Sequence, residues 1–223
     1  MNKKGLIISG GTIEDAFAVQ VIETFAPDYI IGVDSGLQFL YRNQVMPTHI
    51  VGDFDSVDAE VISYYRECTN VPIREFNPVK DATDTEIAVR LAIELGVEEL
   101  WLLGATGTRL DHVMSNMQIL KLALDEGVEA YILDACNRIS LWENEIYLEK
   151  ADAFGTYFSI FPFGGTVERV SIEGAKYPLD NYRLTPFESR TVSNEMADDI
   201  VRITFSDGML LLMETRDGKG KGE

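Results

Sequence analysis

The chain is poor in the residues on which several protein classes depend. Its 223 residues include only two cysteines, Cys68 and Cys136, and two histidines. Two cysteines argue against a disulfide framework, and two histidines are too few for a zinc site rich in histidine. No apolar run approaches the length of a membrane-spanning helix. The sequence also contains no G-x-x-x-x-G-K-[ST] motif, which excludes a P-loop enzyme.

Positive charge is scarce as well. The 19 Lys and Arg residues stand against 37 Asp and Glu, which gives a formal net charge of −18. This balance argues against nucleic acid or an anionic membrane as the main partner. It does not argue against ATP, because a bound metal ion inverts the local field. The N-terminal segment has a very short apolar run, which predicts a buried strand rather than a signal peptide, and we expect a cytoplasmic protein.

Up to about residue 134, short apolar segments alternate with amphipathic ones. The apolar segments are typical of strands covered on both faces; they are residues 6–9, 29–33, 49–51, 73–76, 100–103 and 130–133. Between them, runs such as Ile87, Leu91 and Leu95 have helical spacing. Gly96 and Gly127 stand where helix C-caps belong. The alternation predicts an α/β domain with a doubly wound, mostly parallel sheet.

After about residue 136 the pattern changes to short segments separated by Gly, Pro and Asp. The candidate strands are residues 139–142, 157–161, 167–172, 200–205 and 209–213. Ser206-Asp207-Gly208, between the last two, predicts a β-hairpin. We therefore expect a smaller all-β sandwich domain over residues 137–223, after an α/β domain over residues 1–136.

Four aspartates in two short clusters are the most informative feature of the chain. Asp53 and Asp55 belong to Gly52–Ser56, and Asp84 belongs to Lys80–Glu86. Both clusters lie between a predicted strand and a predicted helix, where α/β folds bind their ligands. Residues two apart on an extended segment point the same way, so Asp53 and Asp55 can face one target. Because carboxylate oxygens and substrate phosphates are the ligands of Mg²⁺, we predict a polyphosphate bound through a metal.

Each cluster also has a purely structural interpretation. Asp and Ser favour turns, and Ser56 is placed to cap a helix that starts just after it. Thr83 and Glu86 have the spacing of a capping box, and the helix dipole favours Asp84 in the first turn. Lys80 is either part of a surface ion pair or a phosphate contact. Two adjacent carboxylates repel each other without a cation, which favours metal binding at the first cluster and leaves the second open.

Other strand-to-turn junctions carry further candidates. Asp34 follows the second predicted strand and is either a helix cap or a site residue. Gly104 begins a glycine-containing loop that allows close backbone approach to a ligand, and Arg109 has the fork that grips a phosphate. Taken alone, His112 is more typical of a structural histidine than of a catalyst. Ser9–Thr12 is similar to a phosphate-binding turn, although two glycines are a weak signal.

Four motifs, taken in order, closely resemble those of the thiamine pyrophosphokinase family. They are Gly-Val-Asp-Ser-Gly at 32–36, Gly-Asp-Phe-Asp-Ser at 52–56, Lys-Asp-x-Thr-Asp-Thr-Glu at 80–86 and Gly-x-x-Gly-x-Arg-x-Asp-His at 104–112. The similarity continues at 174–179 (Gly-Ala-Lys-Tyr-Pro-Leu) and at 192–195 (Val-Ser-Asn-Glu). Any one motif is weak, but the ordered set is specific and extends over nearly the whole chain.

The resemblance implies a transferase that moves the pyrophosphoryl group of ATP to the hydroxyl of thiamine, giving thiamine diphosphate and AMP. It implies that Asp53, Asp55, Asp84 and Asp34 are catalytic. Of these, Asp53, Asp55 and Asp84 would hold Mg²⁺ on the ATP phosphates, with Asp34 nearby. The residues that it places along the nucleotide site are Lys80, Thr83, Gly104, Arg109, Asp111 and His112. Asp111 also has a structural interpretation, as the cap of the next helix.

The resemblance further implies a homodimer whose active site is shared between subunits. Thiamine would lie between the α/β domain of one subunit and the β domain of the other. Tyr177 aligns with an aromatic residue that covers the thiamine ring, and stacking on a cationic thiazolium is favourable. Ser193 and Asn194 would make polar contacts with thiamine. Without the resemblance, Tyr177 is interpreted as core and Ser193-Asn194 as ordinary loop.

Two other classes remain open from the sequence. Asp53–Val57 also fits the Asp-x-Asp-x-[Thr/Val] motif of haloacid-dehalogenase-like phosphatases, in which the first Asp is a nucleophile. That motif normally ends the first strand, whereas here it follows the third. The remaining class is a non-catalytic sensor of thiamine or nucleotide, which would not need the full set of acids.

Overall fold

The computed structural model describes residues 2–75 and 82–218. By its internal contacts the chain divides into two compact units, residues 1–135 and 136–223. The first unit contains five α-helices among the described residues, and a parallel sheet. The second is built from antiparallel strands.

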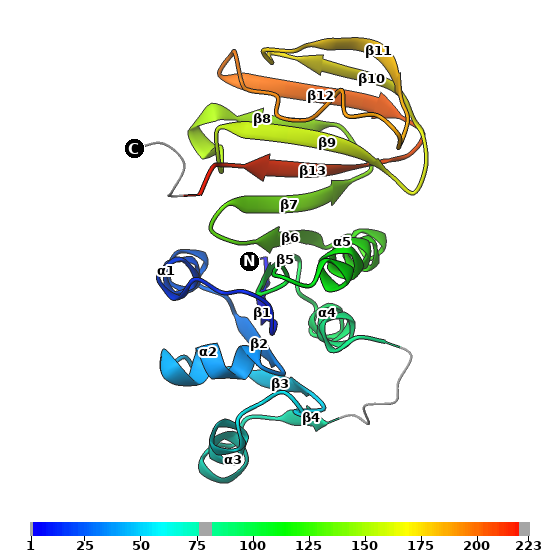
Figure 1. Cartoon of the computed structure of the whole chain (residues 1–223). Helices are drawn as coiled ribbons and strands as arrows, with labels where there is room; N and C mark the ends of the chain where they lie inside the picture. The colour runs from blue at the N-terminus through cyan, green and yellow to red at the C-terminus, as the bar shows by residue number, and fades with distance from the viewer. Residues whose placement is uncertain (1, 76–81, 219–223) are drawn as a thin grey trace. The chain divides into compact units, whose positions relative to one another are not determined.

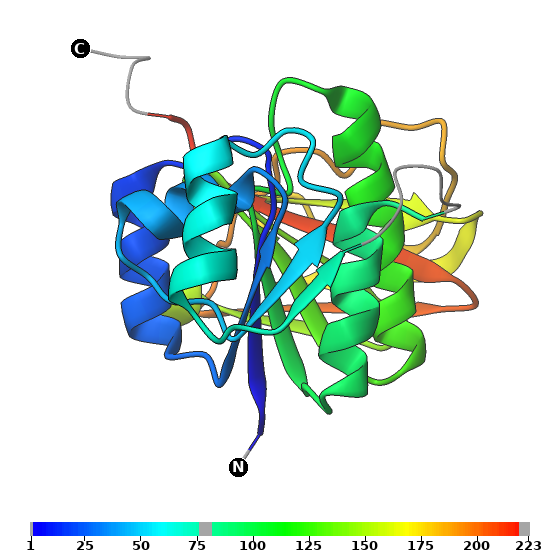
Figure 2. The ribbon, with the colours of Figure 1, turned by 90° about the horizontal axis from the view of Figure 1, so that it is seen from below.

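The first unit is an α/β layer structure. Its strands are β1 (Lys4–Ile8), β2 (Tyr29–Val33), β3 (His49–Gly52), β4 (Ile73–Glu75), β5 (Glu99–Leu103) and β6 (Glu129–Leu133). They pair in parallel in the order β4-β3-β2-β1-β5-β6. The helices are α1 (Asp15–Phe25), α2 (Gly36–Arg42), α3 (Ala59–Cys68), α4 (Asp84–Glu94) and α5 (Leu110–Asp125). Helices α1, α2 and α3 cover one face of the sheet, and α4 and α5 cover the other (Figures 1 and 2).

Burial on both faces explains why these strands are recognisable in the sequence. Leu6, Ile7 and Ile8 of β1 are all fully buried, so both faces of this central strand pack against helices. Gly96 and Gly127 follow α4 and α5 with φ of 74° and 71°, the left-handed conformation that terminates a helix. The prediction of a doubly wound, mostly parallel α/β domain followed by a β-sandwich is confirmed.

The predicted start of α3 is wrong. The helix begins at Ala59 rather than next to Ser56, and its N-cap residue is Asp58, whose side chain makes no capping hydrogen bond. The residues between the expected start and Ala59 belong to a turn that follows Phe54, whose φ is 63°. The Gly-Asp-Phe-Asp-Ser segment is therefore a loop and not the start of a helix. A side chain outside the segment, that of Asp34, accepts hydrogen bonds from its backbone.

The second unit contains two antiparallel sheets. One has the order β7-β13-β9, from β7 (Asn137–Trp142), β9 (Tyr157–Phe163) and β13 (Met209–Thr215). The other has the order β11-β10-β12-β8, from β8 (Ile146–Glu149), β10 (Val167–Glu173), β11 (Leu179–Leu184) and β12 (Ile200–Ser206). Their inner faces share one core, to which Ile160, Val170 and Leu212 each contribute a fully or almost fully buried side chain.

Three features of this unit differ from the sequence predictions. Strands β8 and β11 are absent from the predicted set, because each lies at an edge of its sheet and has exposed or polar residues along much of its length. The predicted hairpin is wrong. Asp207 and Gly208 do turn the chain, with φ of 52° and 127°, but β12 and β13 pair in different sheets. Local turn chemistry sets the reversal, whereas the core determines which strands pair.

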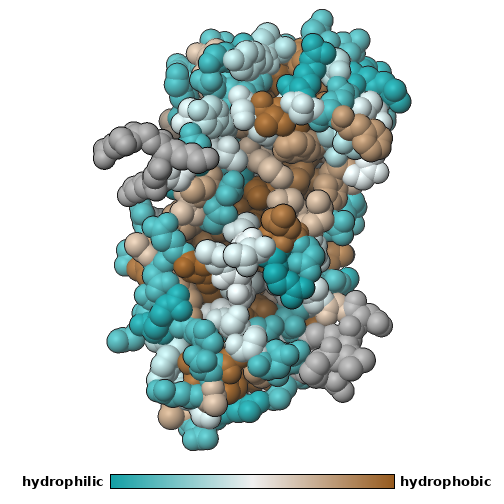
Figure 3. All heavy atoms as spheres, in the orientation of Figure 1, coloured by the Kyte–Doolittle hydropathy of each residue, from teal (hydrophilic) through white to brown (hydrophobic). Residues whose placement is uncertain are grey.

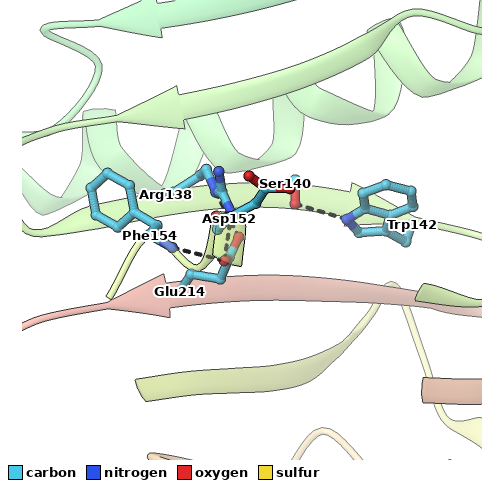
Figure 4. A network of polar contacts seen from close by, with 6 residues as sticks. All are labelled: Arg138, Ser140, Trp142, Asp152, Phe154 and Glu214. Carbon is cyan, nitrogen blue, oxygen red and sulfur yellow. Dashed lines mark hydrogen bonds and ion pairs between the residues drawn. The ribbon is translucent and has the colours of Figure 1, made fainter. Parts of the chain in front are cut away.

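A buried ion pair joins β7 to β13 (Figure 4). The Glu214 side chain is only 7% exposed, and it accepts two hydrogen bonds of 2.6 Å from the Arg138 guanidinium. Arg138 also donates to the Asp152 carbonyl, and the Phe154 N–H donates to Glu214. Because both charges are paired and further hydrogen-bonded, this network ties the 152–154 segment to the two strands.

Hydrophilic residues cover much of the face seen in Figure 3, with hydrophobic patches between them. Within residues 2–75 and 82–218, no helix is both long and apolar enough to cross a membrane.

Candidate functional site

Two glycine-containing turns meet at the carboxyl ends of β1 and β5, where the strand order reverses direction. The Gly11 N–H donates to the Gly104 carbonyl at 2.7 Å, and the Thr12 N–H donates to the Thr106 carbonyl at 2.8 Å. A Cβ at position 11 would lie 2.2 Å from the Thr106 carbonyl oxygen and 2.4 Å from that of Gly104. Only glycine fits there, so the turns form one continuous floor at the switch point where open α/β sheets bind ligands.

A pocket of ≈680 Å³ opens over this floor. Its walls come from the ends of β1, β2, β3 and β5 and from the first turns of α4 and α5. Its polar and charged side chains are Ser9, Thr12, Asp34, Ser35, Asp53, Ser56, Thr83, Asp84, Thr85, Thr106, Thr108, Arg109, His112 and Asn116. Acidic and basic groups from segments far apart in the sequence therefore share one cavity.

Asp34 holds the loop that follows β3. Its Oδ1 accepts the backbone N–H of Asp53 at 3.2 Å and that of Phe54 at 3.4 Å. A Cβ at Gly52 would lie 2.0 Å from the same oxygen. The interpretation of Asp34 as a helix cap is wrong, since the N-cap residue of α2 is Ser35. The carboxylate instead orients the segment that carries Asp53.

Three carboxyl groups crowd together at this end of the sheet. Burial and the neighbouring charges of Asp84 and Asp53 raise the pKa of Asp34 to about 7, against the effect of its hydrogen bond from Phe54. Such crowding of acids in a pocket is costly without a cation, and their oxygen donors are those that Mg²⁺ prefers.

Asp55 occupies a different position from the other acids. It is exposed, it does not line the pocket, and its N–H donates to Asp53 Oδ1 at 3.2 Å. The structure thus brings Asp34, Asp53 and Asp84 together and leaves Asp55 beside them. In the part of the chain that the structure describes, no three His, Cys, Asp or Glu side chains already form a metal-binding group.

The first turn of α4 is fixed on both sides. Thr83 Oγ1 accepts the Glu86 N–H at 3.2 Å, which confirms its predicted capping role, and Asp84 is the first residue of the helix. Thr85 Oγ1 lies 3.0 Å from Oγ of Ser9, which is 3% exposed at the end of β1. This hydroxyl contact links the first turn of α4 to the residue that follows β1. Lys80, the predicted phosphate contact, lies outside the described residues.

The basic side of the pocket lies at the start of α5. Arg109 and His112 line the cavity, whereas Asp111 does not. Arg109 pairs with Asp111 at 2.6 Å, and this guanidinium lowers the pKa of Asp111 to about 2. Helix α5 begins at Leu110, so Asp111 lies within its first turn and is not the cap. His112 is exposed rather than a buried structural residue.

Two polar residues that hold the floor are not among the sequence predictions. Asn116, 7% exposed on α5, donates from Nδ2 to the Ala105 carbonyl at 2.7 Å. Thr106 donates from its hydroxyl to Asp134 at 2.8 Å. The sequence signal for Asn116 is its position on the helical face that also carries the buried Ile119 and Leu120. A lone polar residue on an apolar face needs a partner, and here the partner is the loop.

The candidates in the second unit differ from one another in exposure. Tyr177 is 57% exposed, so its interpretation as core is wrong. Ser193 is exposed, has φ of 57°, and donates its N–H to Ser159 Oγ at 2.9 Å. Asn194 is 3% exposed and hydrogen-bonds to the backbone of Tyr177. The structure therefore brings Asn194 and Tyr177 together, with only the tyrosine ring at the surface.

Two family models match the chain in succession. Residues 24–132 match the thiamin pyrophosphokinase catalytic domain, and residues 143–210 match the thiamin pyrophosphokinase vitamin B1 binding domain. Among curated relatives, the thiamine pyrophosphokinase of Bacillus subtilis is 27% identical over 187 residues, which are 84% of this chain and 87% of the relative. Thiamine pyrophosphokinase 1 of rice is 26% identical over 185 residues, 79% of this chain and 69% of its own.

Solved structures agree with this match. The crystal structure of the Bacillus subtilis thiamine pyrophosphokinase superimposes with a TM-score of 0.85 at 26% identity, covering 97% of this chain and 100% of the other. That of Geobacillus thermodenitrificans gives 0.82 at 28% identity, covering 97% and 99%. The yeast enzyme, at 16% identity, shares the fold with a TM-score of 0.81 and covers 95% of this chain and 86% of its own.

Proposed function

Because this chain belongs to the thiamine pyrophosphokinase family, we propose that it transfers the pyrophosphoryl group of ATP to the hydroxyl of thiamine. The observation that carries the proposal is the pocket at the β1/β5 switch point, which Asp34, Asp53 and Asp84 line together with the glycine floor. A triphosphate with its metal is the ligand that such acids and backbone groups suit.

The nucleotide is assigned to the floor and the start of α5. Gly104 and its neighbours allow the phosphates to approach the backbone closely, and Arg109 and His112 supply donors from the opposite side. Thr83, Asp111 and Lys80 complete the proposed nucleotide site. Arg109 and Asp111 are both exposed, and an exposed ion pair contributes little free energy, so Arg109 can turn toward a phosphate.

The residues fit Mg²⁺ as the metal. Asp53 and Asp84, which line the pocket, are proposed to hold it together with Asp55, which lies beside Asp53 at the edge of the pocket. Asp34 positions Asp53 through the backbone of the 53–54 segment. Mg²⁺ supplies neutralisation of the charge on the phosphate oxygens. The crowded carboxylates support this assignment. Burial and, after it, repulsion from Asp84 and Asp53 raise the pKa of Asp34, and a divalent cation relieves that repulsion.

The reaction is an in-line displacement at the β-phosphorus. A bond forms between the thiamine oxygen and the β-phosphorus, the bridging bond from that phosphorus to the α-phosphate oxygen breaks, and AMP leaves. The hydroxyl proton of thiamine is released in the same overall conversion. Such a transfer depends mainly on positioning and charge neutralisation, which the fixed loops around the pocket provide.

The thiamine site is assigned to the second unit. Tyr177 offers an exposed ring for a cationic thiazolium, and Ser193 offers an exposed hydroxyl. We further propose a cytoplasmic homodimer in which thiamine lies between the first unit of one subunit and the second unit of its partner. These assignments rest on the family resemblance of the motifs at 174–179 and 192–195.

The two alternatives are less favoured. A haloacid-dehalogenase-like phosphatase would carry its nucleophile after the first strand, whereas Asp53 follows β3. A non-catalytic sensor would not need three acids converging on one pocket.

One assay separates the three functions. The purified chain is incubated with ATP, MgCl₂ and thiamine, and the nucleotide and thiamine products are separated and quantified. We expect AMP and thiamine diphosphate in equal amounts. Phosphate release from phosphate esters would indicate the phosphatase, and binding of thiamine or ATP without turnover would indicate the sensor.

A further inference from the structure

The ring of Tyr177 is exposed on a segment that belongs to no strand. The segment between β10 and β11 is fixed by backbone contacts to the 194–196 segment: the Lys176 N–H donates to the Glu195 carbonyl at 2.9 Å, and Ala175 bridges to Met196. These contacts end just before position 177. Another group must therefore hold the backbone at the position from which the ring projects.

The Asn194 side chain holds that backbone. Its Oδ1 accepts the Tyr177 N–H at 3.0 Å, and its Nδ2 donates to the Tyr177 carbonyl at 2.8 Å. The same Oδ1 accepts the Glu195 N–H at 2.9 Å. One amide thus binds both polar backbone groups of Tyr177. If the amide were flipped, its NH₂ group would face the N–H groups of Tyr177 and Glu195, which cannot accept a hydrogen bond. The contacts therefore determine which end of the side chain is the oxygen and which is the nitrogen.

Asn194 is anchored independently of Tyr177. Its own N–H donates to the Phe158 carbonyl at 2.8 Å, and its carbonyl accepts the Phe158 N–H at 2.9 Å. Ser193, next to it, donates to Ser159 Oγ, so this stretch is attached to β9. Asn194 is 3% exposed, and its side-chain oxygen already accepts two hydrogen bonds, which leaves it little capacity for a ligand.

We infer that Asn194 is a positioning residue that sets the Tyr177 ring for thiamine and does not itself contact the substrate. This inference rests on the proposed function. It replaces the polar contact from Asn194 to thiamine that the family resemblance implied. Strand β9 holds Asn194, and Asn194 holds the backbone of Tyr177, from which the ring projects. Asn194 is buried, whereas Tyr177 is exposed.

A double-mutant cycle tests the inference on the full chain. KM for thiamine, KM for ATP and kcat are measured for the unaltered protein, Asn194→Ala, Tyr177→Ala and the double variant. Loss of a cation–π platform predicts that Tyr177→Ala raises the thiamine KM about 10-fold. We expect Asn194→Ala to raise it about 5-fold and the double variant to match Tyr177→Ala alone, because residues acting through one another are not additive. The ATP KM should stay within about 2-fold in all variants.

Further variants separate positioning from general stability. Asn194→Asp keeps the size of the side chain and an oxygen that accepts the Tyr177 and Glu195 N–H groups, but it cannot donate to the Tyr177 carbonyl. Its thiamine KM should therefore lie between those of the unaltered protein and Asn194→Ala. It also answers the question if Asn194→Ala does not fold. Asn144→Ala removes an exposed asparagine before β8 and serves as the control that leaves both KM values unchanged.

The outcomes are distinct. Multiplicative effects of Asn194 and Tyr177 substitutions would show that Asn194 contacts thiamine directly and would overturn the inference while the proposed function stands. Equal losses for thiamine and ATP would show a merely structural role and would also overturn it. If the unaltered protein forms no thiamine diphosphate, the proposed function fails first.

Discussion

At the scale of single residues, the site is decided by which carboxylates share an environment. Asp34 and Asp53 come from loops after neighbouring strands, and Asp84 comes from the start of α4. Asp55 has the same local chemistry as Asp53 but faces solvent. A spacing of two residues predicts that the pair faces one target, and the structure shows that the turn at Phe54 separates their surroundings.

Substitution of these acids tests the metal assignment. Asp53→Asn and Asp55→Asn should each lower kcat about 100-fold, because each removes a charged ligand worth several kcal/mol in the transition state. Steady-state assays over a range of MgCl₂ measure this. The free energy of unfolding should change little in either variant. Asp58→Asn, at an exposed position whose side chain makes no capping bond, is the control. Near-normal turnover of Asp55→Asn at saturating Mg²⁺ would remove Asp55 from the metal site.

Asp34 makes stability depend on pH when a chelator keeps the protein metal-free. Its pKa is about 7 in the folded state, against an ordinary value of 3.8. Between about pH 4 and pH 7 the folded state therefore retains a proton that the unfolded state loses. As a result, the free energy of unfolding falls as the pH rises from about 4 to 7, and the contribution of Asp34 is least favourable above about pH 7.

Asp34→Asn should remove this pH dependence. The amide can still accept the N–H groups of Asp53 and Phe54, and it mimics the protonated carboxyl. Since Asp34 is half-buried, we expect the variant to be more stable by roughly 2 kcal/mol at pH 8, and the difference to vanish near pH 4. Urea unfolding in EDTA at several pH values measures it. A variant that is less stable than the unaltered protein at pH 8 would contradict the expectation.

At the scale of elements, the floor of the pocket depends on two turns in contact. Gly11→Ala places a methyl group 2.2 Å from the Thr106 carbonyl oxygen and must push the turns apart. We expect a loss of about 1–3 kcal/mol in stability from overpacking and a higher KM for ATP, with the thiamine KM less affected. Gly165→Ala, where no atom lies within 4 Å of the new Cβ, is the matched control and should change neither. An unchanged ATP KM in Gly11→Ala would separate the floor from the nucleotide site.

The Arg138–Glu214 pair is the corresponding element-scale feature of the second unit. Glu214→Ala leaves a largely buried guanidinium without its carboxylate, and we expect it to cost about 3–5 kcal/mol of unfolding free energy. Glu145→Ala breaks an exposed pair with Arg202 and should cost less than about 1 kcal/mol. Urea denaturation compares the two variants, and similar losses for both would show that burial does not govern the strength of the pair.

At the scale of the whole molecule, the net charge of −18 acts on stability. Repulsion among surface carboxylates is screened by salt, whereas the exposed ion pairs that salt weakens are each worth little. The melting temperature should therefore rise between about 10 mM and about 300 mM NaCl in the presence of EDTA, because 300 mM shortens the screening length below about 10 Å. Scanning calorimetry measures it, and a falling melting temperature would show that ion pairs outweigh the repulsion.

Local patterns in the amino-acid sequence determined much of this protein by themselves. The buried strands of the parallel sheet, the helix-ending Gly96 and Gly127 and the cap at Thr83 depend on neighbouring residues and on burial on both faces, which the amino-acid order records directly. The ordered motifs likewise indicated the family to which the chain belongs.

Only the tertiary structure decided which groups meet. It directed the Asp34 side chain to the loop after β3 instead of to a helix cap and paired β12 and β13 with different neighbours. It also set the Asn194 side chain against the backbone of Tyr177. These contacts join residues that are far apart along the chain or on different elements. Their geometry follows from how helices and sheets pack, and no local propensity encodes it.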